Sequence, residues 1–296
     1  MITSLKLAPT KRTKVLFVGR TAFIAKDMDS KLDNEPIMPL WFSRGKQSVV
    51  GNVIYGDVNE LLQNRYLEKN VDVIVNYSVM KDSDFEENLK FIRLLFQLAE
   101  KMEVRRFIHI SSMMVYPSNI ERITEFSLID NYKTTLKGQY ARIKMCVDQW
   151  ILKNKSAYNF EVSLLRPGFV YDESVLPKLQ YRLFKNVVLF LGDSNSKLPV
   201  IHIDRFQEYL LKLCMSSEIL PVINLYEPEN IKRKDFLMLQ KSNVITVSVP
   251  RILFLLLPKS FCIYSSMYRV FYSKMEALYR KNQYDNSLSM NFLNQH

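Results

Sequence analysis

The feature that most constrains the fold is an alternation of short apolar runs with segments of helical spacing. The runs are rich in Val, Ile and Phe, as buried parallel strands are, and lie at residues 14–18, 38–42, 53–55, 71–76, 107–110 and 160–165. Helical spacing follows from about residue 22, over 85–102 and over 139–152. Strands that alternate with helices form βαβ units, so we expect an α/β fold with a Rossmann-type doubly wound parallel sheet.

The alternation loosens after about Pro167, where prolines and shorter apolar runs follow. We therefore expect a Rossmann domain over residues 13–170 and a smaller C-terminal substrate-binding lobe over 171–296. A segment near 199–215 is expected to return to the Rossmann domain. Two stretches carry their own expectations: residues 249–272 form a helical cap or, alternatively, a membrane-surface helix, and the polar tail 281–296 is frayed.

Composition limits the class of partner. The net charge is +11, but the basic residues are scattered, and no zinc-finger spacing or RNA-binding motif is present. A basic surface of this kind suits anionic small molecules and permits peripheral contact with an anionic membrane, so we expect no nucleic acid partner. A homodimer is left open.

The cysteines and the N-terminus bear on the compartment. Cys146, Cys214 and Cys262 are odd in number and far apart, so neither a disulfide framework nor a metal site is expected. Residues 1–14 lack the apolar core of a signal peptide. These features predict a cytoplasmic protein that needs no metal.

The first candidate motif is the turn after the first strand, at Gly19. A strand, a glycine turn and a helix N-terminus offer free N–H groups and the positive end of the helix dipole to a pyrophosphate. Such a loop usually has three glycines, but the second and third positions are Ala22 and Ala25. Alanine at the second position is the more serious change, because the backbone there approaches the pyrophosphate. The expected cofactor contacts are Gly19, Arg20, Thr21, Phe23 and Ile24.

The second motif is Tyr140-Ala141-Arg142-Ile143-Lys144, which places Tyr140 and Lys144 one helical turn apart on the same face. The tyrosine pKa is ordinarily ~10, so an acid/base role at neutral pH needs a nearby cation such as Lys144. A solvated Tyr and Lys would show the same spacing. The third motif is Ser112, which follows the strand at 107–110 and has a hydroxyl able to bond a carbonyl. A serine that only caps the next turn is the alternative.

In this order and spacing, the three motifs resemble the extended short-chain dehydrogenase/reductase family, whose members include nucleotide-sugar epimerases, dehydratases and 4-keto reductases. The resemblance runs from about Lys14 to at least Asp204. Further matching positions are Asp57-Val58 near the adenine, Tyr77-Ser78-Val79 beside the cofactor, the helix residue Asn88, Pro167, Gly168 and Val170 over the nicotinamide, and His202-Ile203-Asp204. Arg205 replaces the family's second acidic residue in the last motif.

The resemblance implies a mechanism. Tyr140 exchanges a proton with a sugar hydroxyl or ketone while hydride moves to or from the nicotinamide. Lys144 lowers the pKa of Tyr140 and binds the nicotinamide ribose, and Ser112 holds the substrate oxygen. His109, which alternates with isoleucines, is expected to be a core histidine.

Departures from the family pattern discriminate among its activities. The 4,6-dehydratases have an Asp-Glu pair where this chain has Met113 and Met114, which cannot transfer protons, so a dehydratase is not expected. These two residues and His202 are expected to contact substrate. At the end of the second strand, Ser43 and Arg44 suit the 2′-phosphate of NADP better than the ribose hydroxyl of NAD. A solvated Arg44 explains the sequence equally well.

We therefore expect an NADP-dependent reductase of a nucleotide-linked 4-keto sugar, acting in surface polysaccharide biosynthesis. NAD is the less favoured cofactor. The alternatives are a nucleotide-sugar epimerase and a catalytically degenerate relative that only binds a nucleotide. The intact Ser112, Tyr140 and Lys144 favour an enzyme, while Ala22 and a total of only 7 glycines favour the degenerate binder.

Overall fold

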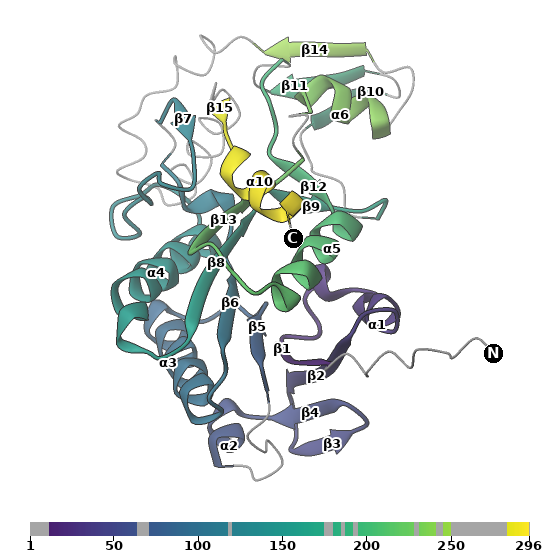
Figure 1. Ribbon diagram of the computed structural model, residues 1–296. Helices are drawn as coiled ribbons and strands as arrows, with labels where there is room; N and C mark the ends of the chain where they lie inside the picture. The colour runs from purple at the N-terminus through teal and green to yellow at the C-terminus, as the bar shows by residue number, and fades with distance from the viewer. Residues whose placement is uncertain are drawn as a thin grey trace, which may run out of the picture.

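A computed structural model of the chain describes residues 12–63, 71–117, 120–174, 180–184, 187–191, 195–227, 231–240, 245–249 and 283–295. Its centre is an eight-stranded sheet with the order β13-β8-β6-β5-β1-β2-β4-β3 (Figure 1). All neighbouring pairs are parallel except β3 and β4. The strands are β1 (Thr13–Val18), β2 (Ile37–Arg44), β3 (Ser48–Val50), β4 (Val53–Gly56), β5 (Val73–Asn76), β6 (Arg106–Ile110), β8 (Glu161–Pro167) and β13 (Val222–Leu225). The predicted doubly wound Rossmann-type sheet is confirmed.

Helices cover both faces of this sheet (Figure 1). One face packs against α2 (Val58–Gln63), α3 (Phe85–Lys101) and α4 (Gln139–Asn154). The other packs against α1 (Met28–Leu32), α5 (Ile203–Met215) and α10 (Ser287–Gln295). All four residues of β5 are buried, because a parallel sheet covered on both sides leaves its central strands no solvent face.

The longest described helix, α3, shows how local sequence sets these elements. Asp84 caps its N-terminus, since its carboxylate accepts a hydrogen bond of 2.8 Å from the amide of Glu87. Its buried side chains recur at helical spacing, at Asn88, Leu89, Ile92, Leu95, Phe96, Leu98 and Ala99. The helix ends where Glu103 adopts a φ of 55°. The helix predicted at 85–102 is confirmed.

The first crossover differs from the prediction of a helix starting near residue 22. Only a single 3-10 turn, η1 (Phe23–Ala25), follows the glycine turn, and Asp27 at φ 56° separates it from the five-residue α1. The carbonyls of Ile24 and Lys26 accept hydrogen bonds of 3.2 and 2.7 Å from Nε2 of Gln207 on α5. The left-handed backbone of Asp27 breaks the segment before α1, so the expected dipole of a long helix is absent here.

The C-terminal third adds smaller elements. They are β9 (Phe169–Tyr171) paired with β12 (Val200–His202), the sheet β10 (Gln180–Phe184), β11 (Val187–Leu191) and β14 (Ile245–Val249), the helix α6 (Arg233–Gln240), and β15 (Gln283–Tyr284) paired with β7 (Arg122–Ile123). Two further 3-10 turns are η2 (Met113–Val115) and η3 (Lys155–Ala157). Figure 1 shows the sheet of β10, β11 and β14 beyond the main sheet, with α6 beside it.

Parts of this third return to the main sheet. Helix α5 packs against β1, and β13 extends the sheet at its edge beside β8. The domain boundary at 170/171 remains a prediction. Apart from Val249, the cap predicted over 249–272 lies outside the described residues. The expectation of a frayed tail is wrong for 283–295, because Met290, Phe292 and Leu293 of α10 are buried in the core.

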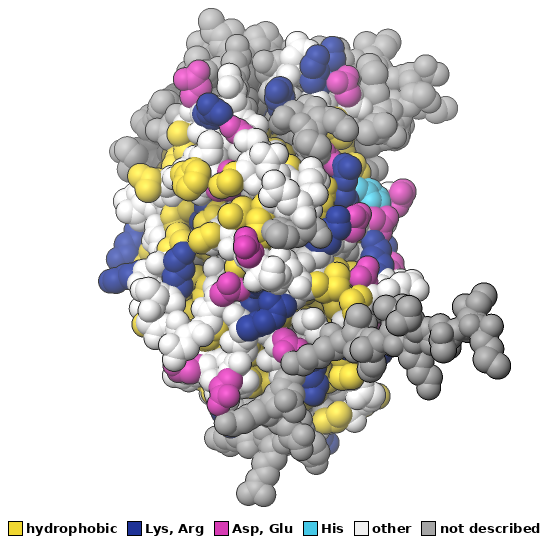
Figure 2. All heavy atoms as spheres, in the orientation of Figure 1, with side chains coloured by type: hydrophobic (Ala, Val, Ile, Leu, Met, Phe, Trp, Pro, Cys, Tyr) yellow, Lys and Arg dark blue, Asp and Glu magenta, His cyan; other side chains and the backbone are white. Residues whose placement is uncertain are grey.

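The surface carries mixed charge. On the face drawn in Figure 2, basic side chains are interspersed with acidic ones and do not gather into one patch. Among the described helices, none has the length and apolarity to cross a bilayer. Likewise, the described His, Cys, Asp and Glu residues form no cluster that could hold a metal ion.

Candidate active site

The catalytic pair lies at the start of α4. Tyr140 is in the first turn and is half-buried, and Lys144 is one turn further and buried. Nζ of Lys144 donates a hydrogen bond of 2.5 Å to the carbonyl of Ile110 at the end of β6. It lies 6.0 Å from the centroid of the Tyr140 ring. The structure therefore brings the two predicted residues together at the carboxyl end of the sheet.

Ser112 follows β6 directly and is the N-cap of η2. Its Oγ accepts a hydrogen bond of 3.2 Å from the amide of Met114, so the capping role considered above is present. A hydroxyl that accepts one bond still has its own hydrogen to donate. Helix α4 packs against η2, and this packing holds Ser112 and the Tyr140–Lys144 pair at the same end of β6.

The protonation of the pair is set mainly by burial. Burial raises the pKa of Tyr140, and the charge of Asp148 raises it further. Burial lowers the pKa of Lys144 to about 8; Asp148 opposes this shift and Lys81 adds to it. The net shift of the Tyr140 pKa is thus upward, and the expected lowering of this pKa by Lys144 stays a prediction. Tyr140 is therefore protonated at neutral pH and suited to donate a proton.

Sequence reasoning missed a second cation at the site. Nζ of Lys81 lies 5.6 Å from the centroid of the Tyr140 ring, and within the described chain Lys81 forms no ion pair. The ring is thus flanked by two ammonium groups, Lys81 and Lys144. The available signal was that Lys81 is the only basic residue in the loop between β5 and α3, at the edge where ligands bind.

A buried polar network anchors α4 to the main sheet, and sequence reasoning missed this network too. Nε of Arg166 donates to Oδ2 of Asp148 at 3.0 Å. Nη1 of Arg166 donates to the hydroxyl of Tyr116 at 2.9 Å, and that hydroxyl donates to Oδ1 of Asn224 at 2.7 Å. All four side chains are at least 99% buried. The network joins α4 to β8, β13 and the end of η2, and Asp148 lies one turn after Lys144.

Lys137 supports the turn that carries Ser112. Its buried Nζ donates hydrogen bonds to the carbonyls of Met114 (2.9 Å) and Tyr116. Because these carbonyls lie in and just after η2, the ammonium group of Lys137 stabilises this turn. Nothing in the spacing of the sequence assigns Lys137 this role, because its partners are 21 and 23 residues away.

The backbone of the glycine turn suits a phosphate. Gly19 has φ 103°, and a Cβ there would lie 2.5 Å from Oγ of Ser78, so glycine is required. Ala22, at φ −66° and ψ 139°, is unstrained, and its amide donates to the carbonyl of Gly19 at 3.0 Å. Four neighbouring amides donate to no group in the described part of the chain: those of Arg20, Thr21, Phe23 and Ile24. Free amides that converge on a turn are what a pyrophosphate requires.

The side chains of this turn have other partners. Arg20 forms an exposed ion pair of 3.0 Å with Asp29, whose other oxygen accepts a hydrogen bond of 2.8 Å from Nε1 of Trp41. In this geometry the Arg20 guanidinium pairs with Asp29, and its predicted contact with the cofactor stays a prediction. Ile24 packs partly against the core. The phosphate contacts available here are therefore mainly backbone amides.

The residues predicted to contact the adenosine half of the cofactor differ in exposure and in the hydrogen bonds that they already form. Ser43 is half-buried and Arg44 is exposed at the end of β2, where Arg44 has no ion-pair partner among the described residues. Asp57 accepts a hydrogen bond of 2.8 Å from the amide of Asn59, and its own amide donates to Glu60 at 2.9 Å. These two bonds cap the start of α2 and occupy the Asp57 carboxylate locally. Val58, predicted to contact the cofactor, is instead a buried core residue.

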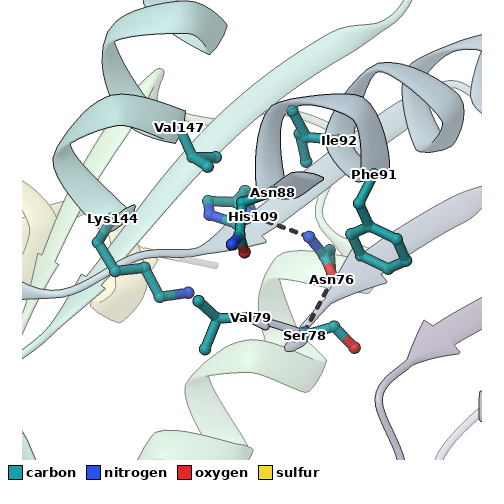
Figure 3. Close-up of a pocket in the computed structure, with 9 residues that line it drawn as sticks. All are labelled: Asn76, Ser78, Val79, Asn88, Phe91, Ile92, His109, Lys144 and Val147. Carbon is teal, nitrogen blue, oxygen red and sulfur yellow. Dashed lines mark hydrogen bonds between the residues drawn. The ribbon is translucent and has the colours of Figure 1, made fainter. Parts of the chain in front are cut away.

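The segment after β5 places the Tyr77 ring in the core, 6.1 Å from the Phe17 ring and 6.4 Å from the Trp41 ring. The predicted passage of this backbone beside the cofactor stays a prediction. Ser78 lies against Gly19, and Val79 lines a small pocket beside Lys144 (Figure 3).

Asn88 shapes the loop in front of α3. Its Oδ1 accepts from the amide of Met80, and its Nδ2 donates to the carbonyls of Met80 and Asp84, at 3.0, 3.0 and 2.8 Å. The side chain is buried. Asn88 therefore holds the loop that carries Lys81, which gives the predicted helix asparagine a positioning role.

The predicted substrate contacts are spread out. Met113 is buried and Met114 is 49% exposed in η2. His202 caps α5, where its Nδ1 accepts from the amide of Asp204 at 3.3 Å. Within the described residues no contact joins His202 to the catalytic pair.

The segment after Pro167 is shaped by packing against the chain itself. At Gly168 a Cβ would lie 2.0 Å from the carbonyl oxygen of Pro199, so this backbone contact explains the glycine. Pro167 ends β8, and Val170 is half-buried on β9. Their predicted nicotinamide contacts stay predictions.

Comparisons with known proteins agree with this geometry. The family model described as "NAD dependent epimerase/dehydratase family" matches residues 15–216. No curated protein matches the chain. Among solved structures, MoeE5 in complex with UDP-glucuronic acid and NAD has a TM-score of 0.63 at 16% identity, over 95% of this chain and 92% of that chain. The terminal R domain of the myxalamid PKS-NRPS pathway has a TM-score of 0.67 at 15% identity, over 97% and 86%.

UDP-glucose 4-epimerase from Thermotoga maritima, solved with UDP-glucose, has a TM-score of 0.57 at 15% identity, over 80% of this chain and 86% of that chain. The doubly wound sheet and the arrangement of Ser112, Tyr140 and Lys144 define a protein of the extended short-chain dehydrogenase/reductase type. The chain belongs to the NAD dependent epimerase/dehydratase family.

Proposed function

We propose that the chain is an NADP-dependent oxidoreductase that reduces the keto group of a nucleotide-linked 4-keto sugar, in the cytoplasm and for surface polysaccharide assembly. The observation that carries the proposal is the position of Tyr140 at the start of α4, where its ring lies 5.6 Å from Nζ of Lys81 and 6.0 Å from Nζ of Lys144. A tyrosine hydroxyl holds its proton at neutral pH, and burial and Asp148 raise the pKa of Tyr140 further. A reduction needs a proton donor at the carbonyl oxygen, and an oxidation needs a base.

In this mechanism Tyr140 gives its proton to the keto oxygen as that oxygen gains negative charge. The hydroxyl of Ser112, which has its hydrogen free, donates a hydrogen bond to the same oxygen and orients it. The resulting phenolate lies beside the ammonium groups of Lys144 and Lys81, which stabilise it until it is protonated again. The hydride is supplied by bound NADPH.

The residues present fit a dinucleotide. The four amides at the Gly19 turn would hold the pyrophosphate, and the guanidinium of Arg44 at the end of β2 would hold the 2′-phosphate; neither group has a partner among the described residues. NAD, which is bound in several similar structures, is the alternative if Arg44 remains solvated. The choice of a nucleotide sugar rests on the family and on the ligands of MoeE5 and of the epimerase.

Two observations keep other activities in view. Ala22 and Ala25 depart from the family pattern on the cofactor side, which is what a degenerate nucleotide binder would show. A nucleotide-sugar epimerase would use the same Ser112, Tyr140 and Lys144 without net consumption of cofactor. A dehydratase is disfavoured because Met113 and Met114 cannot transfer protons.

The test is to incubate the purified protein with NADPH and a UDP- or dTDP-linked 4-keto-6-deoxyhexose. We expect NADPH absorbance to fall and the sugar nucleotide to gain two hydrogens by mass. Tyr140→Phe, which binds NADPH but cannot donate the proton, is the control. Interconversion of a UDP-hexose without NADPH loss would support the epimerase. NADPH binding without any turnover would support the degenerate binder.

A further inference from the structure

The 3-10 turn η1, two of whose amides are available to a phosphate, is too short to hold itself in place. It is closed by hydrogen bonds from the amides of Ala25 and Lys26 to the carbonyls of Ala22 (2.9 Å) and Phe23 (3.0 Å). An isolated helical turn is unstable, because fixing its backbone costs more than its few hydrogen bonds contribute. A long helix would supply the support, but α1 begins only after the left-handed residue Asp27. Groups outside the crossover must therefore hold η1.

Helix α5 holds the carbonyl end of η1 through Gln207. Figure 1 shows α5 beside the first crossover, and the two elements are in contact. Nε2 of Gln207 donates to the carbonyls of Ile24 at 3.2 Å and Lys26 at 2.7 Å, so both hydrogens of the side-chain amide are used. In a helical turn the carbonyls and the amides point in opposite directions along the axis. A fixed Ile24 carbonyl therefore sets the direction in which the amides of Phe23 and Ile24 point.

Gln207 departs from the apolar pattern of its own helix. It lies on the stripe formed by Ile203, Leu210 and Cys214, and its side chain is 1% exposed. A buried side-chain amide is destabilising unless its polar atoms are hydrogen-bonded. An apolar residue would carry no such cost at this position. The two carbonyls of the first crossover explain why a glutamine is there.

A second contact joins the same crossover to the C-terminal third. Nζ of Lys26 forms an ion pair of 2.9 Å with Oδ2 of Asp172, a residue that follows β9 and is 5% exposed. Oδ1 of Asp172 accepts hydrogen bonds from the amide and the hydroxyl of Ser174, at 2.9 and 2.7 Å. The Lys26 side chain is half exposed, so this pair alone stabilises little. The stronger restraint on η1 is therefore the buried Gln207.

We propose that Gln207 is a positioning residue for the cofactor: it holds η1 so that the amides of Phe23 and Ile24 are oriented toward the pyrophosphate. Gln207 thus takes the place of the long first helix that this chain lacks. The restraint on η1 follows from the two hydrogen bonds and needs no bound ligand, whereas its benefit to cofactor binding rests on the proposed function. Cofactor affinity then depends on a side chain more than 180 residues from the turn.

The first experiment measures amide hydrogen exchange by NMR in the protein without cofactor. Gln207→Met keeps the length of the side chain but removes the donor. We expect the amides of Ala25 and Lys26 to exchange roughly 10- to 100-fold faster in this variant, because two hydrogen bonds are lost. The matched control is Gln149→Met on α4, which removes a bond of 3.1 Å from a glutamine amide to the carbonyl of Asp130 and should leave both rates unchanged.

Two results of this experiment would overturn the positioning role. One is unchanged exchange of the η1 amides in Gln207→Met. The other is faster exchange spread evenly over α5 and the main sheet, because Gln207 would then support the fold in general and not this turn.

The second experiment is calorimetric titration of NADPH into the same three proteins. We expect Gln207→Met to bind roughly tenfold more weakly than the wild type, and Gln149→Met to bind as the wild type does. Equal affinity of a folded Gln207→Met would overturn the role of Gln207 toward the cofactor and leave the proposed function standing. No binding by the wild type would contradict the proposed function itself, and the exchange rates would still show whether Gln207 holds η1.

If Gln207→Met does not fold, the wild type decides. Because two carbonyls hold the side-chain amide of Gln207, its protons should exchange with water at least roughly tenfold more slowly than those of the exposed Gln47. NMR of the side-chain amides measures both rates. Equal rates would mean that Gln207 does not hold the turn in solution, which would overturn the proposal.

Discussion

The two halves of the candidate site differ in how far they follow their family. On the catalytic side, Ser112, Tyr140 and Lys144 lie on η2 and a 16-residue helix that a buried ion pair anchors to the sheet. On the cofactor side, the first crossover is a three-residue 3-10 turn and a five-residue helix, and two of the three turn glycines of the family are alanines. The contrast indicates that the catalytic motifs follow the family pattern more closely than the glycine turn and the first crossover do.

The largest expected effect is on the catalytic side. Tyr140→Phe removes the proton donor and leaves the ring in place, so we expect kcat to fall by roughly 10²–10⁴-fold with little change in NADPH affinity. Single-turnover kinetics and a cofactor titration of the same variant measure the two effects separately. Retention of more than a tenth of the activity would remove Tyr140 from the mechanism.

The anchoring network should be the next most sensitive feature. Asp148→Asn leaves the buried Arg166 without its counter-charge, so we expect a loss of about 3–5 kcal/mol in the free energy of unfolding. The control is Glu208→Gln, which breaks an exposed ion pair of 3.5 Å with Lys212 on α5 and should cost less than about 0.5 kcal/mol. Urea denaturation compares the two. Equal losses would mean that the Asp148–Arg166 pair does not anchor α4.

On the cofactor side the expected effect is smaller. Arg44→Ala should reduce the preference for NADPH over NADH by roughly 1.5–3 kcal/mol, because a charge-assisted contact to the 2′-phosphate is lost. Fluorescence titration with both cofactors measures the difference. Lys46→Ala, on the same exposed hairpin, is the matched control and should leave the preference unchanged. Equal affinities of the wild type for the two cofactors would favour NAD.

Lys144 should also make stability depend on pH. Its pKa is about 8 in the folded chain and ordinarily 10.5, so between these values the unfolded chain binds more protons. Stability therefore rises with pH in this window, with a slope of at most about 1.4 kcal/mol per pH unit from this group. Denaturation of the wild type and Lys144→Met at both ends of the window isolates the effect. Parallel pH dependence of the two proteins would show that Lys144 is not shifted.

Much of the frame could be predicted because its signals are local. The apolar run of β5 and the helical spacing of α3 fixed both elements, and the Tyr140–Lys144 pair follows from one turn of helix. The failures involve distant partners. The short first crossover contacts Gln207, which is more than 180 residues away, and the Tyr77 ring packs against Phe17 and Trp41 in the core. Neither partner can be identified from spacing along the chain.

The polar tail shows the same limit. Its composition suggests solvent exposure, yet Met290, Phe292 and Leu293 pack into the core on the face that α5 also covers. The position of Asp148, one turn after Lys144, can likewise be read from the sequence. Its partner Arg166 cannot, because Arg166 lies on another element. What could not be predicted was which distant side chain meets which.

Calorimetric titration of NADPH into the wild type and Ala22→Gly tests most directly whether the Gly19 turn, with alanine at residue 22, binds a cofactor. Because the backbone amides at Gly19 remain free and Ala22 is unstrained, we predict micromolar binding to the wild type, about −8 kcal/mol. Removing the methyl group lets the backbone approach the pyrophosphate more closely, so Ala22→Gly should bind more tightly. No heat of binding in either folded protein would contradict the account and leave a Rossmann-type scaffold without its cofactor.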